Sequence, residues 1–187
     1  MAAIETASKI GLISKALVLC GEQPLNSLSD SRYGATVGGS LYEQLYEAEL
    51  QSNRWRFSCA KVALSQLVDV PLNEFKHAYQ LPSAMLLPLG TYPASRYEIY
   101  GDHLYTNQSS VELEHQFKPD ISECPAYFTL LLTYALFRDL VGPITESTAK
   151  MQVAAQLYNV QRSRAMFADA QGRSNRPIAD SPFTAGR

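Results

Sequence analysis

The histidines are the first residues to test for metal binding or acid–base chemistry, because imidazole supports both near neutral pH. His77, His103 and His115 are scattered and lack the close helical spacing that zinc hydrolases use. His115 alternates with Leu113 and Phe117, which places it on an apolar strand face. We therefore interpret His115 as a hydrogen-bonded, half-buried side chain, and the sequence predicts no metal site.

The thiols and hydroxyls likewise form no recognisable nucleophilic site. Cys20, Cys59 and Cys124 are odd in number and lack C-x-x-C spacing, so they indicate neither a disulfide framework nor a zinc site. Buried free thiols in a reducing cytoplasm are the expected state. The pair Ser58–Cys59 and the segment Ser122–Cys124 have no general base at a recognisable spacing.

The remaining acidic and glycine-containing segments have structural explanations. Asp120 and Glu123 lie at a predicted helix start, where carboxylates interact favourably with the helix dipole. The segment "YGATVGGS" follows a predicted helix cap rather than a strand and has no lysine, so it does not match a phosphate-binding loop. The residues favour a non-enzymatic structural or binding protein without a cofactor.

Composition limits the possible partners. The 187 residues carry a net charge of −2 with a pI near 5.9, which gives no general attraction for nucleic acid or anionic lipid. The longest apolar run, "CPAYFTLLLTYALF", is too short to span a bilayer and is followed by Arg138 and Asp139. We expect a soluble intracellular product, and its length fits one domain with room for one sizeable insertion.

The first part of the chain predicts two helices. The first covers residues 3–20 and is ended by Gly21, with an apolar stripe at three- and four-residue spacing. The second begins near Ser29 or Asp30, either of which can cap it. Its predicted core stripe is Val37, Leu41, Leu45 and Ala48. Gly38 and Gly39 within this helix indicate either a close approach by another segment or a tolerated weak point.

From Trp55 the apolar period falls to two, which predicts strands. In "WRFSC" the residues Trp55, Phe57 and Cys59 alternate with polar side chains. "YEIYGDHLYT" predicts a hairpin with Gly101–Asp102 as its turn, and "VELEHQF" alternates again. Residues 55–118 are therefore predicted to be an antiparallel β-insertion.

Helical patterns return after the insertion. Ser122 is the predicted cap of a third helix that is apolar nearly all round and ends at "VGP" (141–143). A fourth helix is predicted from Ile144 to Ala170. Its predicted apolar side consists of Val153, Leu157, Val160 and Phe167.

These elements define an α+β fold. Residues 1–54 and 119–170 are predicted to form an antiparallel bundle of about four helices, and residues 55–118 form the β-insertion between helices 2 and 3. Residues 171–187 are rich in proline and glycine and are predicted to be an extended, flexible C-terminal arm.

The C-terminal arm is also rich in arginine. From Gln161 onward there are five arginines against only Asp169 and Asp180. A flexible basic segment can order on an acidic partner surface. A solubilising tail is an equally good interpretation of the composition.

The order of segments along the chain resembles the head-to-tail adaptor family of tailed bacteriophages, especially the tail tubular proteins A of short-tailed phages. "ALVLCGEQPLNSL" is similar to the family's first helix and Gly-x-x-Pro loop, and "ELQSNRWRFSCAKVAL" to its Trp-x-Phe switch into the first strand. "YQLPSAMLLPL" resembles its Tyr-x-Leu-Pro segment, although the family often has an acidic residue where Ala84 stands. The stretch from "YEIYGDHLYT" to "LLTYALF" resembles its hairpin, strand and apolar helix.

The resemblance implies a virion protein of the head–tail junction, made in the host bacterial cytoplasm. It implies a ring, as a dodecamer, beneath the portal protein, which extends the channel for double-stranded DNA and offers a platform to the tail nozzle or tail tube. DNA would pass through without specific binding, and no membrane would be involved. Trp55 and Phe57 would pin the β-insertion onto the bundle. The arm would bind the portal, and the residues assigned to this contact are Arg173, Arg176, Pro177, Phe183 and Arg187.

Two other functions remain open at this point. A terminator or completion protein of the tail tube would co-purify with tube protein rather than with portal. A small cytoplasmic enzyme with an unrecognised site would show itself through ligand binding.

Overall fold

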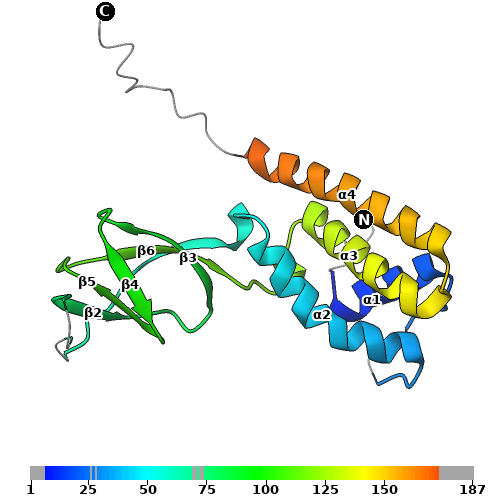
Figure 1. Cartoon of the computed structure of the whole chain (residues 1–187), viewed down its shortest axis with the longest axis horizontal. Coiled ribbons are helices and arrows are strands. Elements are labelled where there is room, and N and C mark those ends of the chain that lie inside the picture. Colours follow the sequence, from blue (N-terminus) through cyan, green and yellow to red (C-terminus); the bar gives the residue numbers. More distant parts are fainter. Residues whose placement is uncertain (1–6, 26, 28, 69–70, 72–73, 173–187) are drawn as a thin grey trace, which may run out of the picture.

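The computed structural model describes residues 7–25, 27, 29–68, 71 and 74–172. Helices gather at one end of the elongated chain and strands at the other (Figure 1). The described elements, in chain order, are α1 (Lys9–Cys20), α2 (Tyr33–Gln51), η1 (Arg56–Ser58), β1 (Cys59–Ala63), β2 (His77–Gln80), β3 (Met85–Tyr92), β4 (Tyr97–Tyr100), β5 (His103–Thr106), β6 (Glu112–Phe117), η2 (Ile121–Glu123), α3 (Ala126–Thr145) and α4 (Thr148–Gln171). The predicted α+β class, with four helices and antiparallel sheets between α2 and α3, is confirmed.

Helix α1 ends where the sequence predicts. Ser8 caps its start by accepting a hydrogen bond from the Gly11 N–H at 3.1 Å. Gly21 adopts a left-handed conformation with φ of 98°, and the next amide bonds back to the Leu17 carbonyl at 2.9 Å. Glycine reaches this conformation without the steric cost of a Cβ, so the helix stops there. The predicted start at residue 3 lies outside the described residues.

Helix α2 differs from its prediction in both its start and its buried face. It begins at Tyr33, because the Asp30 carboxylate accepts hydrogen bonds from Arg32 and holds a loop instead of capping the helix. Of the predicted core stripe only Leu45 is buried, Val37 and Leu41 are half-buried, and Ala48 is exposed. The buried face is Ala35, Gly38, Tyr42, Leu45, Tyr46, Glu49 and Leu50.

Helix α3 is the centre of the bundle. It packs against α1, α2 and α4, and nine of its residues are buried, so its all-round apolar sequence is explained. Its N-cap is Pro125 rather than Ser122, since Ser122 belongs to the short turn η2, which Asp120 caps. The predicted stop at "VGP" is wrong: the helix continues through Pro143 to Thr145, whose hydroxyl donates to the Val141 carbonyl at 2.7 Å.

Helix α4 starts at Thr148, because Ser147 accepts a hydrogen bond from the Lys150 N–H and the preceding residues belong to α3. Its predicted apolar side is not the side that packs on the bundle. The buried residues are Ala154, Gln161, Ala165 and Asp169, whereas Val153, Leu157, Val160 and Phe167 are exposed. The side of α4 that packs on the bundle therefore consists of small and polar residues.

The insertion consists of two antiparallel three-stranded sheets, in the orders β1-β6-β3 and β2-β5-β4. The predicted hairpin is present, with Gly101 at φ of 61° between β4 and β5. The insertion has a small core of its own, formed by Tyr79, Leu81, Leu104, Val111 and Leu113.

Two predictions within the insertion are corrected. "WRFSC" is not a strand, because residues 56–58 form the turn η1 and β1 begins only at Cys59. His115 is buried rather than half-buried, and its Nδ1 has no hydrogen-bond partner among the described residues. The apolar strand face was correctly predicted, but the expected hydrogen bond is absent at this nitrogen.

Candidate functional site

The first candidate region is the junction between the bundle and the sheets, which contains the predicted site residues Trp55 and Phe57. Trp55 follows the end of α2 and is 0% exposed. Its indole lies edge-on to Phe128 of α3, with ring centroids 5.3 Å apart, and Phe57 lies 4.9 Å from the same ring. Tyr127 completes the cluster at 6.4 Å from Trp55. Trp55 and Phe57 thus share one aromatic cluster at the start of α3.

Hydrogen bonds fix the position of Trp55 in this cluster. Its indole N–H donates to the Glu49 carbonyl in the last turn of α2 at 2.7 Å. Its own carbonyl accepts from the Ser58 hydroxyl at 3.1 Å and from the Cys59 thiol at 3.0 Å. A buried indole N–H needs such a partner. The turn η1 is therefore held between the end of α2 and the start of β1.

Gln116 of β6 binds the junction from the side of the sheets. The sequence analysis did not identify this residue. Its side-chain amide donates to the Leu50 and Asn53 carbonyls, at 3.2 Å and 2.8 Å, and lies 3.2 Å from the Ser58 hydroxyl. The side chain is 1% exposed. The pattern of "VELEHQF" placed Gln116 on the polar face with two glutamates, and nothing in the sequence indicated that this end of the face is covered.

Helix α4 reaches the junction through Asp169, which was also missed. The carboxylate accepts hydrogen bonds from the Arg56 amide at 3.1 Å and from the Tyr127 hydroxyl at 2.9 Å. Burial, and then the hydrogen bond to Asp169, raises the pKa of Tyr127. Four segments that are distant in sequence, from α2, β6, α3 and α4, therefore meet at one place.

A second buried acid links α2 to α4. Glu49 is 4% exposed, and one of its carboxylate oxygens accepts the Tyr158 hydroxyl at 2.8 Å. Its other oxygen has no partner among the described residues. Burial raises the pKa of the Glu49 carboxyl, which the hydrogen bond from Tyr158 and the nearby Arg138 only partly offset.

The surroundings of the three cysteines do not activate their thiols. Burial raises the pKa of all three thiols, that of Cys20 to about 11, so none is activated as a nucleophile. Within residues 7–172, apart from the positions that the structure does not describe, no group of three metal-ligating side chains comes together.

The predicted portal contacts Arg173, Arg176, Pro177, Phe183 and Arg187 lie outside the described residues. The structure does show where the preceding helix ends. Gly172 lies against Arg56 at the junction, so closely that a Cβ at this position would collide with the guanidinium. A hollow of about 350 Å³ opens there beside Phe57, Tyr127 and Asp169.

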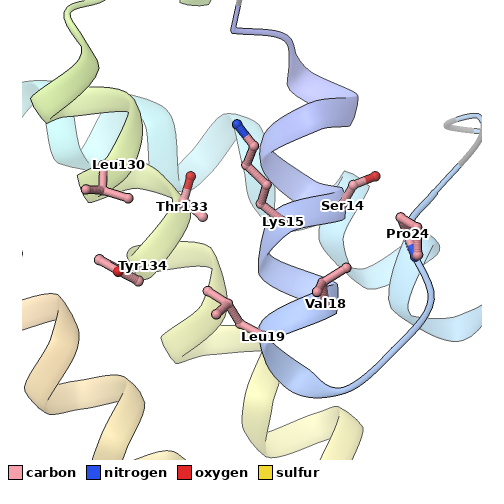
Figure 2. A pocket seen from close by; sticks show the side chains of 8 residues that line it. All are labelled: Ser14, Lys15, Val18, Leu19, Pro24, Leu130, Thr133 and Tyr134. Atoms are coloured by element: carbon pink, nitrogen blue, oxygen red, sulfur yellow. The ribbon is translucent and has the colours of Figure 1, made fainter. Parts of the chain in front are cut away.

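The second candidate region is an apolar groove between α1 and α3 (Figure 2). We call it the α1–α3 groove; its volume is about 410 Å³, and its lining residues are Ser14, Lys15, Val18, Leu19, Pro24, Leu130, Thr133 and Tyr134. Val18, Leu19 and Leu130 are all substantially exposed. Only Lys15 in this set is charged, so the groove suits an apolar occupant.

Helix α4 also has a row of exposed apolar side chains. Figure 2 shows α4 running beside α3, beyond Tyr134. Val153 and Val160 are each 50% exposed and Phe167 is 68% exposed. We call the set Val153, Leu157, Val160 and Phe167 the α4 ridge. An amphipathic helix normally turns such residues to the core, so the ridge is an apolar surface that the described part of the bundle leaves uncovered.

Helix α3 is also long and apolar enough to cross a membrane, by length and composition alone. It is the one described helix of this kind. A central core helix meets the same criterion, and α3 is covered by the other three helices.

Comparison with models of known protein families gave no match, and no similar sequence was found among curated proteins.

Proposed function

We propose that this chain is a structural protein of tailed bacteriophages, an adaptor that forms a ring beneath the portal. The ring extends the DNA channel and provides the docking platform for the tail nozzle or tail tube. The observation that carries this proposal is the order of the adaptor-like segments along the chain. The fold that this order implies, two helices, a β-insertion and two further helices, is the fold of the chain.

The contacts at the junction are consistent with a structural role for the whole protein. Trp55, Gln116 and Asp169 connect the bundle to the sheets through buried rings and hydrogen bonds. A subunit that must keep a channel aligned benefits when its two parts move as one block.

Charge is also compatible with a DNA conduit. The chain has a net charge of −2. A channel wall with many fixed positive charges would retain the duplex through counterion release, whereas a neutral or weakly acidic wall lets DNA slide. The ring would therefore pass DNA without binding it specifically.

The proposal is tested by mixing the full chain with purified portal protein of the same phage. We expect co-sedimentation and, in negative-stain images, a ring of added density below the portal. A chain that lacks residues 171–187 should lose portal binding, because these residues contain the arginine-rich arm. A double substitution on the outer face of α2, Ser40→Glu with Gln44→Glu, is the matched control and should bind normally. Absence of binding by the full chain would refute the adaptor role.

A further inference from the structure

Glu49 of α2 is a buried acid with a hydrogen bond at only one of its two carboxylate oxygens. The residue is 4% exposed, and its Oε1 accepts a hydrogen bond from the Tyr158 hydroxyl of α4 at 2.8 Å. Its Oε2 has no partner among the described residues. An ionised carboxylate needs hydrogen bonds or water at both oxygens, and burying one without them is strongly unfavourable. While α4 covers this position, it therefore suits the protonated acid.

The surrounding charges do not supply the missing partner. The ionisable groups that face the Glu49 carboxyl are Tyr158 and Arg162 of α4 and Arg138 and Asp139 of α3. The Arg138 guanidinium is bound by Asp139 at 2.6 Å and lies over the Tyr158 ring, 4.3 Å from its centroid. Among the described residues neither arginine forms an ion pair with Glu49. Burial therefore dominates and raises the pKa of this carboxyl.

Helix α4 is the part of this cover that can open at the lowest cost. It lies along one side of the bundle, against α3 (Figure 1). Helix α3 buries nine residues, most of them large, whereas the buried residues of α4 are Ala154, Gln161, Ala165 and Asp169. Two alanines bury little apolar area, and segments with few buried apolar contacts open locally. Polar contacts hold the middle of α4 instead, from Tyr158 to Glu49 and from the Gln161 amide to the Tyr127 carbonyl at 3.0 Å.

We propose that Glu49 and Tyr158 form a latch, operated by one proton, that controls how often the middle of α4 opens from the bundle. When Glu49 is protonated, the bond to Tyr158 holds α4 without burying a charge. When Glu49 is ionised, opening of α4 lets water reach Oε2, so the open form becomes more populated. The latch goes beyond the proposed function and does not depend on it, because it needs neither portal nor ring.

The direction of the pH effect follows from proton linkage. In the open form Glu49 is in water and has its ordinary pKa of 4.5, whereas in the closed form burial raises its pKa. The closed form is therefore fully favoured below 4.5 and loses this advantage as the pH rises through the closed-form pKa. For one linked proton the opening equilibrium constant rises by up to about tenfold per pH unit between the two pKa values, and it is level above them.

The experiment is amide hydrogen exchange of the full chain, measured by mass spectrometry from pH 4.5 to neutrality. Each rate is divided by the rate of an unstructured chain at the same pH. We expect the amides of residues 154–165 to lose protection as the pH rises in the wild type and to keep it in Glu49→Gln, which retains an acceptor for the Tyr158 hydroxyl. Glu47→Gln makes the same change at a partly exposed position on α2 and should follow the wild type.

A second variant, Tyr158→Phe, tests the other half of the latch. Without the hydroxyl, an ionised Glu49 has no partner at either oxygen among the described residues, so the closed form should bind its proton more tightly. We expect the loss of protection in α4 to extend to higher pH than in the wild type. Circular dichroism checks that each variant is folded.

Three results would overturn the latch. One is the same pH course in the wild type and Glu49→Gln, and another is a Tyr158→Phe course that matches the wild type. The third is an equal response of the α3 and α4 amides, because the proton would then act on unfolding of the whole chain rather than on α4. None of these results bears on the adaptor role, which is tested by portal binding.

Discussion

The side-chain amide of Gln116 donates a 2.8 Å hydrogen bond to the carbonyl of Asn53, so the last strand of the insertion is tied directly to the end of α2. The two residues belong to parts of the chain that otherwise have separate cores. This contact, with the bond to the Leu50 carbonyl, satisfies backbone groups that the end of a helix leaves free.

Replacing Gln116 by leucine should weaken the junction. The substitution keeps the volume but removes this donor from the Leu50 carbonyl, which costs about 1–3 kcal/mol for a buried acceptor, whereas the Asn53 carbonyl still accepts the Trp55 N–H at 2.9 Å. We expect a lower melting temperature and faster proteolysis between α2 and β1. Gln44→Leu, an exposed position on α2, is the control and should leave both unchanged. An unaltered cleavage rate would show that the amide does not hold the two parts together.

Replacing Trp55 by alanine should destabilise the whole chain. The indole is fully buried against Phe128 and Phe57, and loss of a large ring from such a site costs about 3–5 kcal/mol. Chemical denaturation followed by circular dichroism measures the change. Phe167→Ala removes a ring that is 68% exposed and should be nearly neutral in the monomer. A Trp55→Ala melting temperature within a degree or two of the wild type would contradict the central packing role.

The sequence predicts this fold well where local chemistry decides the structure. Gly21 and the turn at Gly101–Asp102 were located correctly, because their backbone conformations favour glycine. The apolar side predicted for α4 was wrong, because Val153, Leu157, Val160 and Phe167 are exposed. The core of the bundle is filled by large residues of α3, so α4 contributes Ala154 and Ala165 instead.

The junction could not be predicted because its polar residues are explained only by distant partners. Asp169 is buried where it meets the Arg56 amide and the Tyr127 hydroxyl, more than forty residues away in sequence. Likewise the alternation at Trp55 is real, but the contact of its indole with α2 and α3 holds the backbone in a turn rather than a strand. Spacing along the chain contains no information about such contacts.

The adjacent glycines of α2 should respond in opposite directions to alanine. A Cβ on Gly38 would lie 2.7 Å from Cγ2 of Ile13, so α1 packs closely there, whereas a Cβ on Gly39 meets nothing within 4 Å. Gly39→Ala should stabilise the chain by about 0.5–1 kcal/mol through helix propensity. Gly38→Ala should destabilise it by about 1–3 kcal/mol, because α1 must shift. Urea denaturation measures both, and equal stabilisation by the two substitutions would disprove the close approach of α1.

The buried Glu49 should make the chain less stable as the pH rises. Burial raises the pKa of this carboxyl above its ordinary value of 4.5, so the folded chain binds the proton more tightly than the unfolded chain. The stability that this provides is complete below 4.5 and is lost as the pH rises through the folded-state pKa. Exposed acids such as Glu43, whose pKa is lowered by hydrogen bonds from Lys118 and Lys9, act in the opposite direction. The effect of Glu49 must therefore be isolated by a variant.

Glu49→Gln removes the charge and keeps an oxygen that can accept the Tyr158 hydroxyl. We expect the variant to gain stability relative to the wild type as the pH rises from 4.5 toward neutrality, because only the wild type must then bury a carboxylate. Urea denaturation of both proteins across this range measures the difference in unfolding free energy. Glu47→Gln, a partly exposed neighbour on α2, provides the comparison. A difference between Glu49→Gln and wild type that is constant with pH would mean that the carboxyl titrates alike in the folded and unfolded chain.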